Sequence, residues 1–205
     1  MLHKNLVLVV GLLAALATQG GEAPLLHRTR ISRCGISLSV IKGSVTRQVA
    51  VAESPCQFGI VPPGWSRARR QAAFELPETA IDVAVYAAPL KTVAEEHGFM
   101  SVAELRRRLD EPSMCKGLPP DAFVVQGGRG TPECEQAIPI AGKQFAGIRG
   151  EASYGRMRKH TGAYVGLGTQ CFAAVSSGST TVYFEGTEGY CEDEFSHLVN
   201  SISKP

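Results

Sequence analysis

The sequence predicts an exported α+β domain, in which helices pack on a single antiparallel sheet to form an α/β sandwich stabilised by disulfides. A short apolar run near the N-terminus has the form of a secretory signal, and six cysteines follow it. Segments of alternating apolar and polar residues flank a helical middle part, and an amphipathic stretch closes the chain. Together these patterns indicate strands and helices that are crosslinked outside the reducing cytosol.

The first residues predict a signal peptide. Lys4 gives a basic start, and the apolar run from Leu6 to Ala17 is too short to cross a bilayer as a helix, which takes roughly 20 residues. Ala15-Leu16-Ala17 matches the A-x-A cleavage pattern, so residues 1–17 are expected to be removed, with cleavage after residue 20 as the alternative. We expect a periplasmic or secreted protein with no membrane insertion after cleavage.

The rest of the chain is expected to form one domain. Residues 18–33 are interpreted as a leader ahead of the fold, and residues 34–205 have the length of a single domain. A domain of this size buries enough surface to fold without a cofactor, so none is expected. The formal net charge of +2 gives no global field that would attract nucleic acid, so no nucleic-acid partner is expected either.

The first half of the domain has the period of two that is typical of half-buried strands. Expected strands cover residues 36–40, 45–51, 56–60 and 81–85. Lys42-Gly43 supplies a turn between the first pair. The third strand should stop at Pro62-Pro63-Gly64, because proline cannot donate a hydrogen bond to the sheet.

The middle of the chain is expected to be helical. One helix should run over residues 89–97 and end at Gly98. A second should begin after Ser101, with Glu104 completing a capping box, and stop at Pro112. Residues 112–139 are rich in proline and glycine and are interpreted as a long loop with one short strand at 122–125.

The last third returns to strands, expected at residues 144–149, 152–158, 164–167, 171–175 and 181–185. A final helix is expected over residues 188–203. Cys191, Phe195, Leu198 and Ile202 fall on one stripe of this helix, so the stripe should lie on the sheet.

Six cysteines allow fifteen pairings, and the sequence alone does not choose among them. The spacing suggests the pairs Cys34–Cys56, Cys115–Cys134 and Cys171–Cys191. Each would close a loop of about twenty residues, which corresponds to roughly 3 kcal/mol in the chain-entropy model. Metal binding and a reactive thiol are the alternatives. No C-x-x-C pair occurs and no cysteine has a histidine within four residues, so no metal site is expected.

Catalytic motifs are absent at the level of the sequence. The nearest approach to a serine-hydrolase elbow, residues 150–155, lacks the first glycine, and no phosphate-binding loop occurs. Paired carboxylates can come from distant parts of a chain, so they stay open as an enzymatic alternative. The histidines after the signal are expected to be solvated surface residues: His27, His97, His160 and His197.

Aromatic residues are the candidate partner contacts. Trp65, the single tryptophan, follows the third strand, where it is either a contact residue for a partner or part of the core. Tyr154, Tyr164 and Tyr183 occur through the late strands and can line one face of the sheet. Trp65, Tyr154 and Tyr164 are therefore taken as possible partner contacts.

The order of these segments resembles a known group. A strand ending in a proline-glycine-tryptophan corner (residues 58–65) precedes the strand at 81–85 and a helical segment, and late strands run into a helix ending in Val199-Asn200-Ser201-Ile202. This order is similar to the Mog1/PsbP/DcrB-like α/β/α sandwiches and covers roughly residues 34–203. The six cysteines and the loop at 112–139 depart from the usual pattern. Because known members are mostly non-enzymatic, the resemblance implies a binding role and no catalytic residues.

From these observations we expect an exported, non-catalytic binding or accessory protein of the bacterial cell envelope. Its partner would be another envelope protein or a secreted protein. One alternative is a periplasmic immunity protein that neutralises a secreted antibacterial toxin. A second alternative is a hydrolase with dispersed catalytic residues.

Overall fold

The computed structural model describes residues 25–48, 56–72, 75–108, 115–126, 132–157, 161, 164–187, 189–191 and 193–205. Only the backbone is described at 125–126, 132–136, 152–157, 164–168 and 193. The expected signal peptide, residues 1–17, lies outside the described residues. In the described part of the chain, no helix has the length and apolar character needed to span a membrane.

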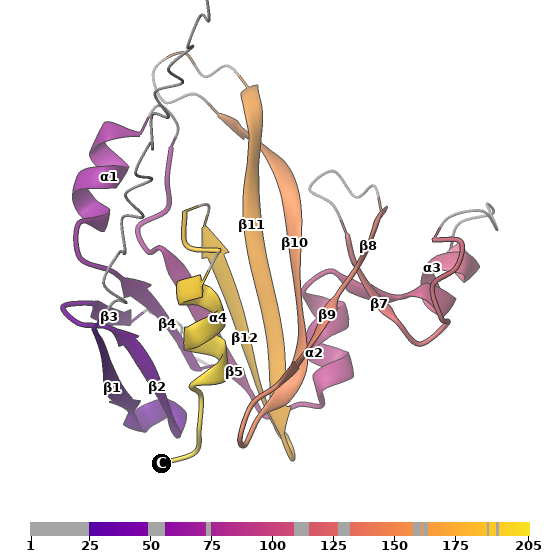
Figure 1. The fold of residues 1–205 in the computed structure, drawn as a ribbon, viewed down its shortest axis with the longest axis horizontal. Helices are drawn as coiled ribbons and strands as arrows, with labels where there is room; N and C mark the ends of the chain where they lie inside the picture. The colour runs from indigo at the N-terminus through magenta and orange to yellow at the C-terminus, as the bar shows by residue number, and fades with distance from the viewer. Residues whose placement is uncertain are drawn as a thin grey trace, which may run out of the picture.

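A seven-stranded antiparallel sheet forms the centre of the fold and confirms the predicted α+β class (Figure 1). Each neighbouring pair in this sheet is antiparallel. The strands lie in the spatial order β3 (Val45–Gln48), β4 (Cys56–Val61), β5 (Ile81–Tyr86), β12 (Thr180–Thr187), β11 (Tyr164–Ser177), β10 (Ala146–Met157) and β9 (Ile138–Ala141).

Two smaller sheets accompany the large one. Strand β1 (Leu26–Ile31) pairs with β2 (Ile36–Ile41), and β6 (Phe99–Ser101) pairs with β7 (Phe123–Gln126), which pairs with β8 (Pro132–Gln136). The leader interpretation of residues 18–33 is therefore wrong for the residues of β1. This strand buries only Ile31, so it lacks the alternation that reveals a strand in a sequence, and its pairing with β2 holds it in place.

In the segment expected to be a long loop, residues 112–139, the described residues contain more strand than predicted. The short strand expected at 122–125 is confirmed by β7, but β8 and the start of β9 were not anticipated. Both missed strands contain a proline, Pro132 and Pro139, and proline is tolerated in a strand mainly at a sheet edge. The composition suggested turns where the structure has edge strands.

The described helices are α1 (Trp65–Gln71), α2 (Leu90–Glu96), α3 (Val102–Arg108) and α4 (Asp193–Asn200), together with a short 3₁₀ turn, η1 (Ser32–Cys34). Helix α2 ends before Gly98, which has a φ of 85° as a left-handed cap requires. The cap of α3 is confirmed, since the Glu104 amide donates to Ser101 Oγ at 3.2 Å. Helix α1 was not predicted, and α4 is shorter than the expected 188–203.

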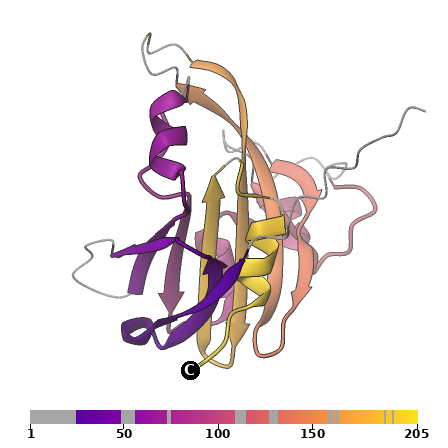
Figure 2. The same ribbon diagram turned by 60° about the vertical axis from the view of Figure 1, so that its left-hand side comes forward.

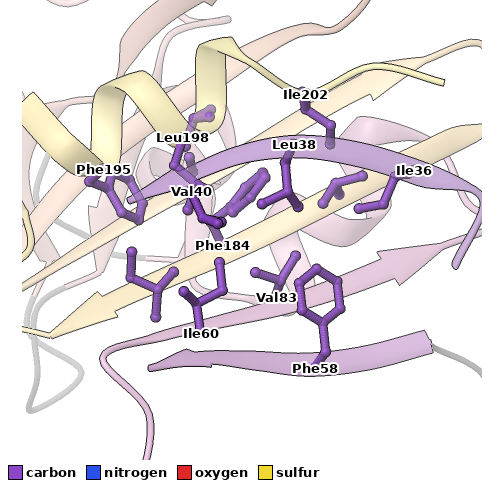
Figure 3. Close-up of a cluster of buried hydrophobic side chains, with 14 of the residues drawn as sticks. Ile36, Leu38, Val40, Phe58, Ile60, Val83, Phe184, Phe195, Leu198 and Ile202 are labelled. Carbon is purple, nitrogen blue, oxygen red and sulfur yellow. The ribbon is translucent and has the colours of Figure 1, made fainter. Parts of the chain in front are cut away.

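One face of the sheet is covered by the β1–β2 hairpin and by α4 (Figure 2). Figure 3 shows side chains from these elements pointing toward those of the sheet. The expected stripe is confirmed at Phe195, Leu198 and Ile202, which are buried. Cys191 precedes α4 and is half-buried, so it is not part of the helical stripe. The largest fully buried side chains of this core are Phe58, Phe145, Phe184, Phe195, Ile36, Leu38, Val83 and Val175.

Two of the expected disulfides are present. Cys34–Cys56 ties the hairpin to β4, with Cα atoms 5.5 Å apart, and Cys171–Cys191 ties β11 to the segment before α4, with Cα atoms 5.3 Å apart. Cys115 is disulfide-bonded as well. The side chain of Cys134, its expected partner, lies outside those described. None of the described cysteines is free.

Candidate binding site on the open face of the sheet

The other face of the sheet is only partly covered. Helix α2 packs there against β11 and β12, in a second cluster that contains Val93, Phe99, Ala174 and Tyr183. Beyond the reach of α2, this face of β4, β5 and β12 borders a cavity of about 210 Å³. The cavity is lined by Gln57, Phe58, Asp82, Val83, Ala84, His97, Tyr183 and Glu185.

Strand register brings two carboxylates together at this cavity. Asp82 on β5 is paired directly with Glu185 on β12. Like charges directly opposite each other on neighbouring strands are destabilising. In the described part of the chain neither carboxylate forms an ion pair, since the ion pairs there use Glu95 and Glu104. The pair therefore presents negative charge to whatever enters the cavity.

Neutral donors hold each carboxylate in place. The Thr79 hydroxyl donates to Asp82 Oδ1 at 2.6 Å, and the Gln170 amide donates to Glu185 Oε1 at 2.6 Å. Gly59, opposite Asp82 on β4, leaves room for this arrangement, because a Cβ there would collide with the Thr79 side chain. Hydrogen bonds orient the two carboxylates without neutralising them.

The two acids differ in their surroundings. Asp82 is exposed at the mouth of the cavity, whereas Glu185 is partly buried. Burial raises the pKa of Glu185, and the nearby Asp82 carboxylate raises this pKa further. A cation placed between the two groups would favour the charged form of Glu185 and so lower its pKa. The site is therefore suited to bind a cation or to hold a proton.

An aromatic wall closes the end of the cavity beside α2. The His97 ring stacks on Tyr183, with ring centroids 3.6 Å apart and planes 13° apart. The Tyr86 hydroxyl lies 2.6 Å from His97 Nε2, within hydrogen-bond distance. Burial lowers the pKa of His97, although the charge of Glu96 acts against it. The imidazole is thus neutral at pH 7, and it can accept a hydrogen bond from Tyr86.

Tyrosine ionisation adds no reactive group at neutral pH. Burial raises the pKa of Tyr183, and the charges of Glu185 and Tyr86 raise it further. Burial, followed by the charge of Glu96, also raises the pKa of Tyr86. This wall therefore carries no positive charge that would neutralise the acids. The expectation that His97 is a solvated surface residue was wrong, because it is half-buried between two tyrosines.

The candidate contacts named from the sequence lie elsewhere. Trp65 is 2% exposed and packs edge-on against Tyr190, with ring centroids 5.3 Å apart, so it belongs to the core on the α4 side and is not available as a partner contact. Tyr154 and Tyr164 lie on β10 and β11, but their side chains are outside those described. Tyr183 does line a sheet face, as its place among the late strands suggested.

The sequence did not single out Asp82 or Glu185. Each was one polar position in a strand pattern, and their pairing depends on a register that joins β5 to a strand almost a hundred residues later. No protein-family model matches the chain, and no curated protein matches it either. The resemblance to Mog1/PsbP/DcrB-like proteins stays a prediction.

The size and donor set of the cavity restrict its ligands. Its volume of about 210 Å³ is below the roughly 300 Å³ at which small-molecule sites usually begin, so it accommodates a group the size of a side chain. Among the described residues there is no group of three or more histidine, cysteine, aspartate or glutamate residues that could hold a metal ion. The geometry suits an organic cation beside an aromatic wall.

Proposed function

We propose that this protein is an exported, non-catalytic binding protein of the bacterial cell envelope. Its pocket would receive a lysine or arginine side chain of a partner protein, either another envelope protein or a secreted one. The observation that carries the proposal is the Asp82–Glu185 pair, which is held by neutral donors and has no cationic partner among the described residues.

The energetics favour a cationic guest. The carboxylates repel each other across the strands, and burial works against the charged form of Glu185. A guanidinium or ammonium group would favour the charged form of both acids. It could donate hydrogen bonds to the two carboxylates in the orientation that Thr79 and Gln170 already give them. Opposite charges also speed the encounter of two proteins.

Disulfides support the proposed location. Crosslinks such as Cys34–Cys56 and Cys171–Cys191 persist in oxidising compartments and are rare in the cytosol. The signal-like start of the sequence agrees with export. Edman sequencing of the mature protein, together with cell fractionation, would test the cleavage site and the compartment.

The binding test uses a matched pair of peptides, Gly-Ser-Arg-Ser-Gly and its citrulline counterpart, which has the same shape without the charge. Isothermal titration should show tighter binding of the arginine peptide to the wild type. Glu185→Gln should reduce that affinity by about tenfold, because a charge-assisted hydrogen bond is lost. Glu75→Gln, at an exposed position outside the cavity, serves as the matched control. Equal binding of the two peptides to the wild type would contradict the proposal.

A hydrolase is the second candidate, and the same pair of acids is the observation that favours it. An acid with a raised pKa beside a second carboxyl group is the arrangement of a general acid and its partner. Glycan substrates are the first class to test. Release of reducing sugar from peptidoglycan fragments, lost in both Asp82→Asn and Glu185→Gln, would favour catalysis over binding.

A further inference from the structure

A second cavity lies on the opposite face of the sheet, between β9 and α4. Its volume is about 380 Å³, within the range of roughly 300–1,000 Å³ that is usual for ligand sites. The walls come from residues 138–141 of β9 and from Phe195, Ser196, Val199 and Asn200 of α4. Arg149 of β10 also lines it, on the face that carries the main core, because it pairs with Ala173 of that core. We call this cavity the β9–α4 groove.

Arg149 brings a positive charge into the groove. Its side chain is half-buried and donates from Nη1 to Ser196 Oγ. Within the described ranges it forms no ion pair, and Glu151, two residues further along the same face of β10, is exposed and makes none with it. A guanidinium has five N–H donors arranged in a fork that fits a carboxylate. Among the described residues Ser196 Oγ is the acceptor for this guanidinium, so most of its donors have no partner there.

The rim of the groove is apolar. Ile138 is 52% exposed although it belongs to the large sheet, and Ile140 on the same face of β9 is half-buried. An exposed isoleucine beside a half-buried arginine offers contacts to a ligand that is both acidic and apolar. On the α4 side, the exposed Asn200 at the end of the helix lines the groove with a polar side chain.

We propose that the β9–α4 groove binds an extended segment of a partner protein through an acidic side chain flanked by apolar residues. The carboxylate pairs with the Arg149 guanidinium, and the flanking residues lie against Ile138 and Ile140. Charge complementarity selects an acidic occupant, and the exposed isoleucine selects apolar neighbours. This site differs from the Asp82–Glu185 pocket in sheet face, in charge and in ligand.

The occupant does not extend the sheet as an added strand. Strand β9 stands at the end of the sheet order, so one of its edges faces away from β10. It is short, however, and Pro139 in its middle has no N–H to donate. Proline on an edge strand is a device that resists strand addition. Recognition therefore depends on side chains that enter the groove.

The test compares two labelled peptides, Gly-Ile-Ser-Glu-Ser-Ile-Gly and its glutamine counterpart, by fluorescence polarisation; the isoleucines stand two positions from the glutamate, so that all three side chains share one face of the extended peptide. The glutamate peptide should bind the wild type about tenfold more tightly, because its carboxylate adds charge-assisted hydrogen bonds. Arg149→Gln should remove this difference, and Arg149→Lys should keep part of it, since lysine retains the charge without the fork. Arg47→Gln, at an exposed position on β3 at the far edge of the sheet, should keep it in full.

Three results would overturn the proposal: equal affinity of the two peptides for the wild type, no binding of either at millimolar concentration, or unchanged discrimination in Arg149→Gln. If that variant does not fold, Ile138→Asp decides, because it places a carboxylate on an exposed rim position. Both peptides should lose the apolar contact with Ile138, but the glutamate peptide should be weakened further because it also meets a like charge. An unchanged preference for the glutamate peptide would refute the site. The double variant Asp82→Asn/Glu185→Gln should leave the discrimination intact, which separates this proposal from the first.

Discussion

The Cys171–Cys191 bridge offers a test of how the terminal helix is held in place. Removing it with Cys171→Ala/Cys191→Ala frees the segment before α4 in the unfolded chain. The bridge closes a loop with a sequence separation of 20, for which the chain-entropy model gives about 3 kcal/mol. In a domain of this size, 1 kcal/mol shifts the melting temperature by roughly 2–4 °C, so the variant should melt roughly 6–12 °C lower.

Urea unfolding and calorimetry of the purified, oxidised variants would measure this loss. The matched comparison is Cys34→Ala/Cys56→Ala, which opens a loop with a sequence separation of 22. The entropic term differs between the two bridges by only about 0.1 kcal/mol, so equal losses are expected if chain entropy dominates. A loss below about 1 kcal/mol for Cys171→Ala/Cys191→Ala would refute the reasoning. It would mean that the unfolded chain already restrains α4 without the bridge.

Three further predictions concern the core and the site. Phe195→Asp should prevent folding, because an unpaired charge in the core costs several kcal/mol and the whole free energy of unfolding of a domain is roughly 5–15 kcal/mol. A cooperative thermal transition close to that of the wild type would show that α4 is not docked on the sheet. Folding lowers the pKa of His97, so as the pH drops the His97 imidazole is protonated in the unfolded chain before it is protonated in the folded protein. The free energy of unfolding should therefore fall below about pH 6.5. Urea unfolding of His97→Phe should show a weaker dependence of this free energy on pH over the same range. The pKa of Glu185 is raised by folding, so the wild type should lose stability as the pH rises from about 4.5 through the folded pKa, and Glu185→Gln should abolish that loss in the same assay.

Local sequence patterns were sufficient to predict a strand or helix where that element buries one regular face. Ile36, Leu38 and Val40 alternate with serines, and they form β2 in the main core. The Ser101 cap of α3 and the glycine that follows α2 were also readable, because each serves a local backbone need. Such elements carry their own signal in the sequence, independent of distant parts of the chain.

Elements stabilised by distant partners were missed. Strand β1 is mostly exposed and depends on its pairing with β2, while β8 and β9 are edge strands that contain prolines. Helix α1 was hidden by its run of arginines, since only Trp65 is buried and no apolar stripe marks the helix. Cys191 was placed on the terminal helix because its spacing from Phe195 continued the period, although the helix begins two residues later.

The candidate site was beyond sequence reasoning for a physical reason. Asp82 and Glu185 become neighbours only when β5 and β12 pair, and an aspartate or glutamate on the polar side of a strand usually faces water. The distinctive fact is that the half-covered sheet face combines this pair with the stacked His97 and Tyr183. That combination depends on how α2 packs against β11 and β12, which the pattern of neither strand records.

The pocket with Asp82 and Glu185 lies on strands that are held rigidly before any ligand binds. Asp82 and Glu185 lie on two adjacent strands with partners on both sides, so their backbones are fixed before a ligand arrives. The hydrogen bonds from Thr79 and Gln170 fix the two side chains as well. Binding then requires little loss of conformational entropy from this protein. It follows that affinity should depend on charge more than on adaptation, and that rising salt should weaken it steadily.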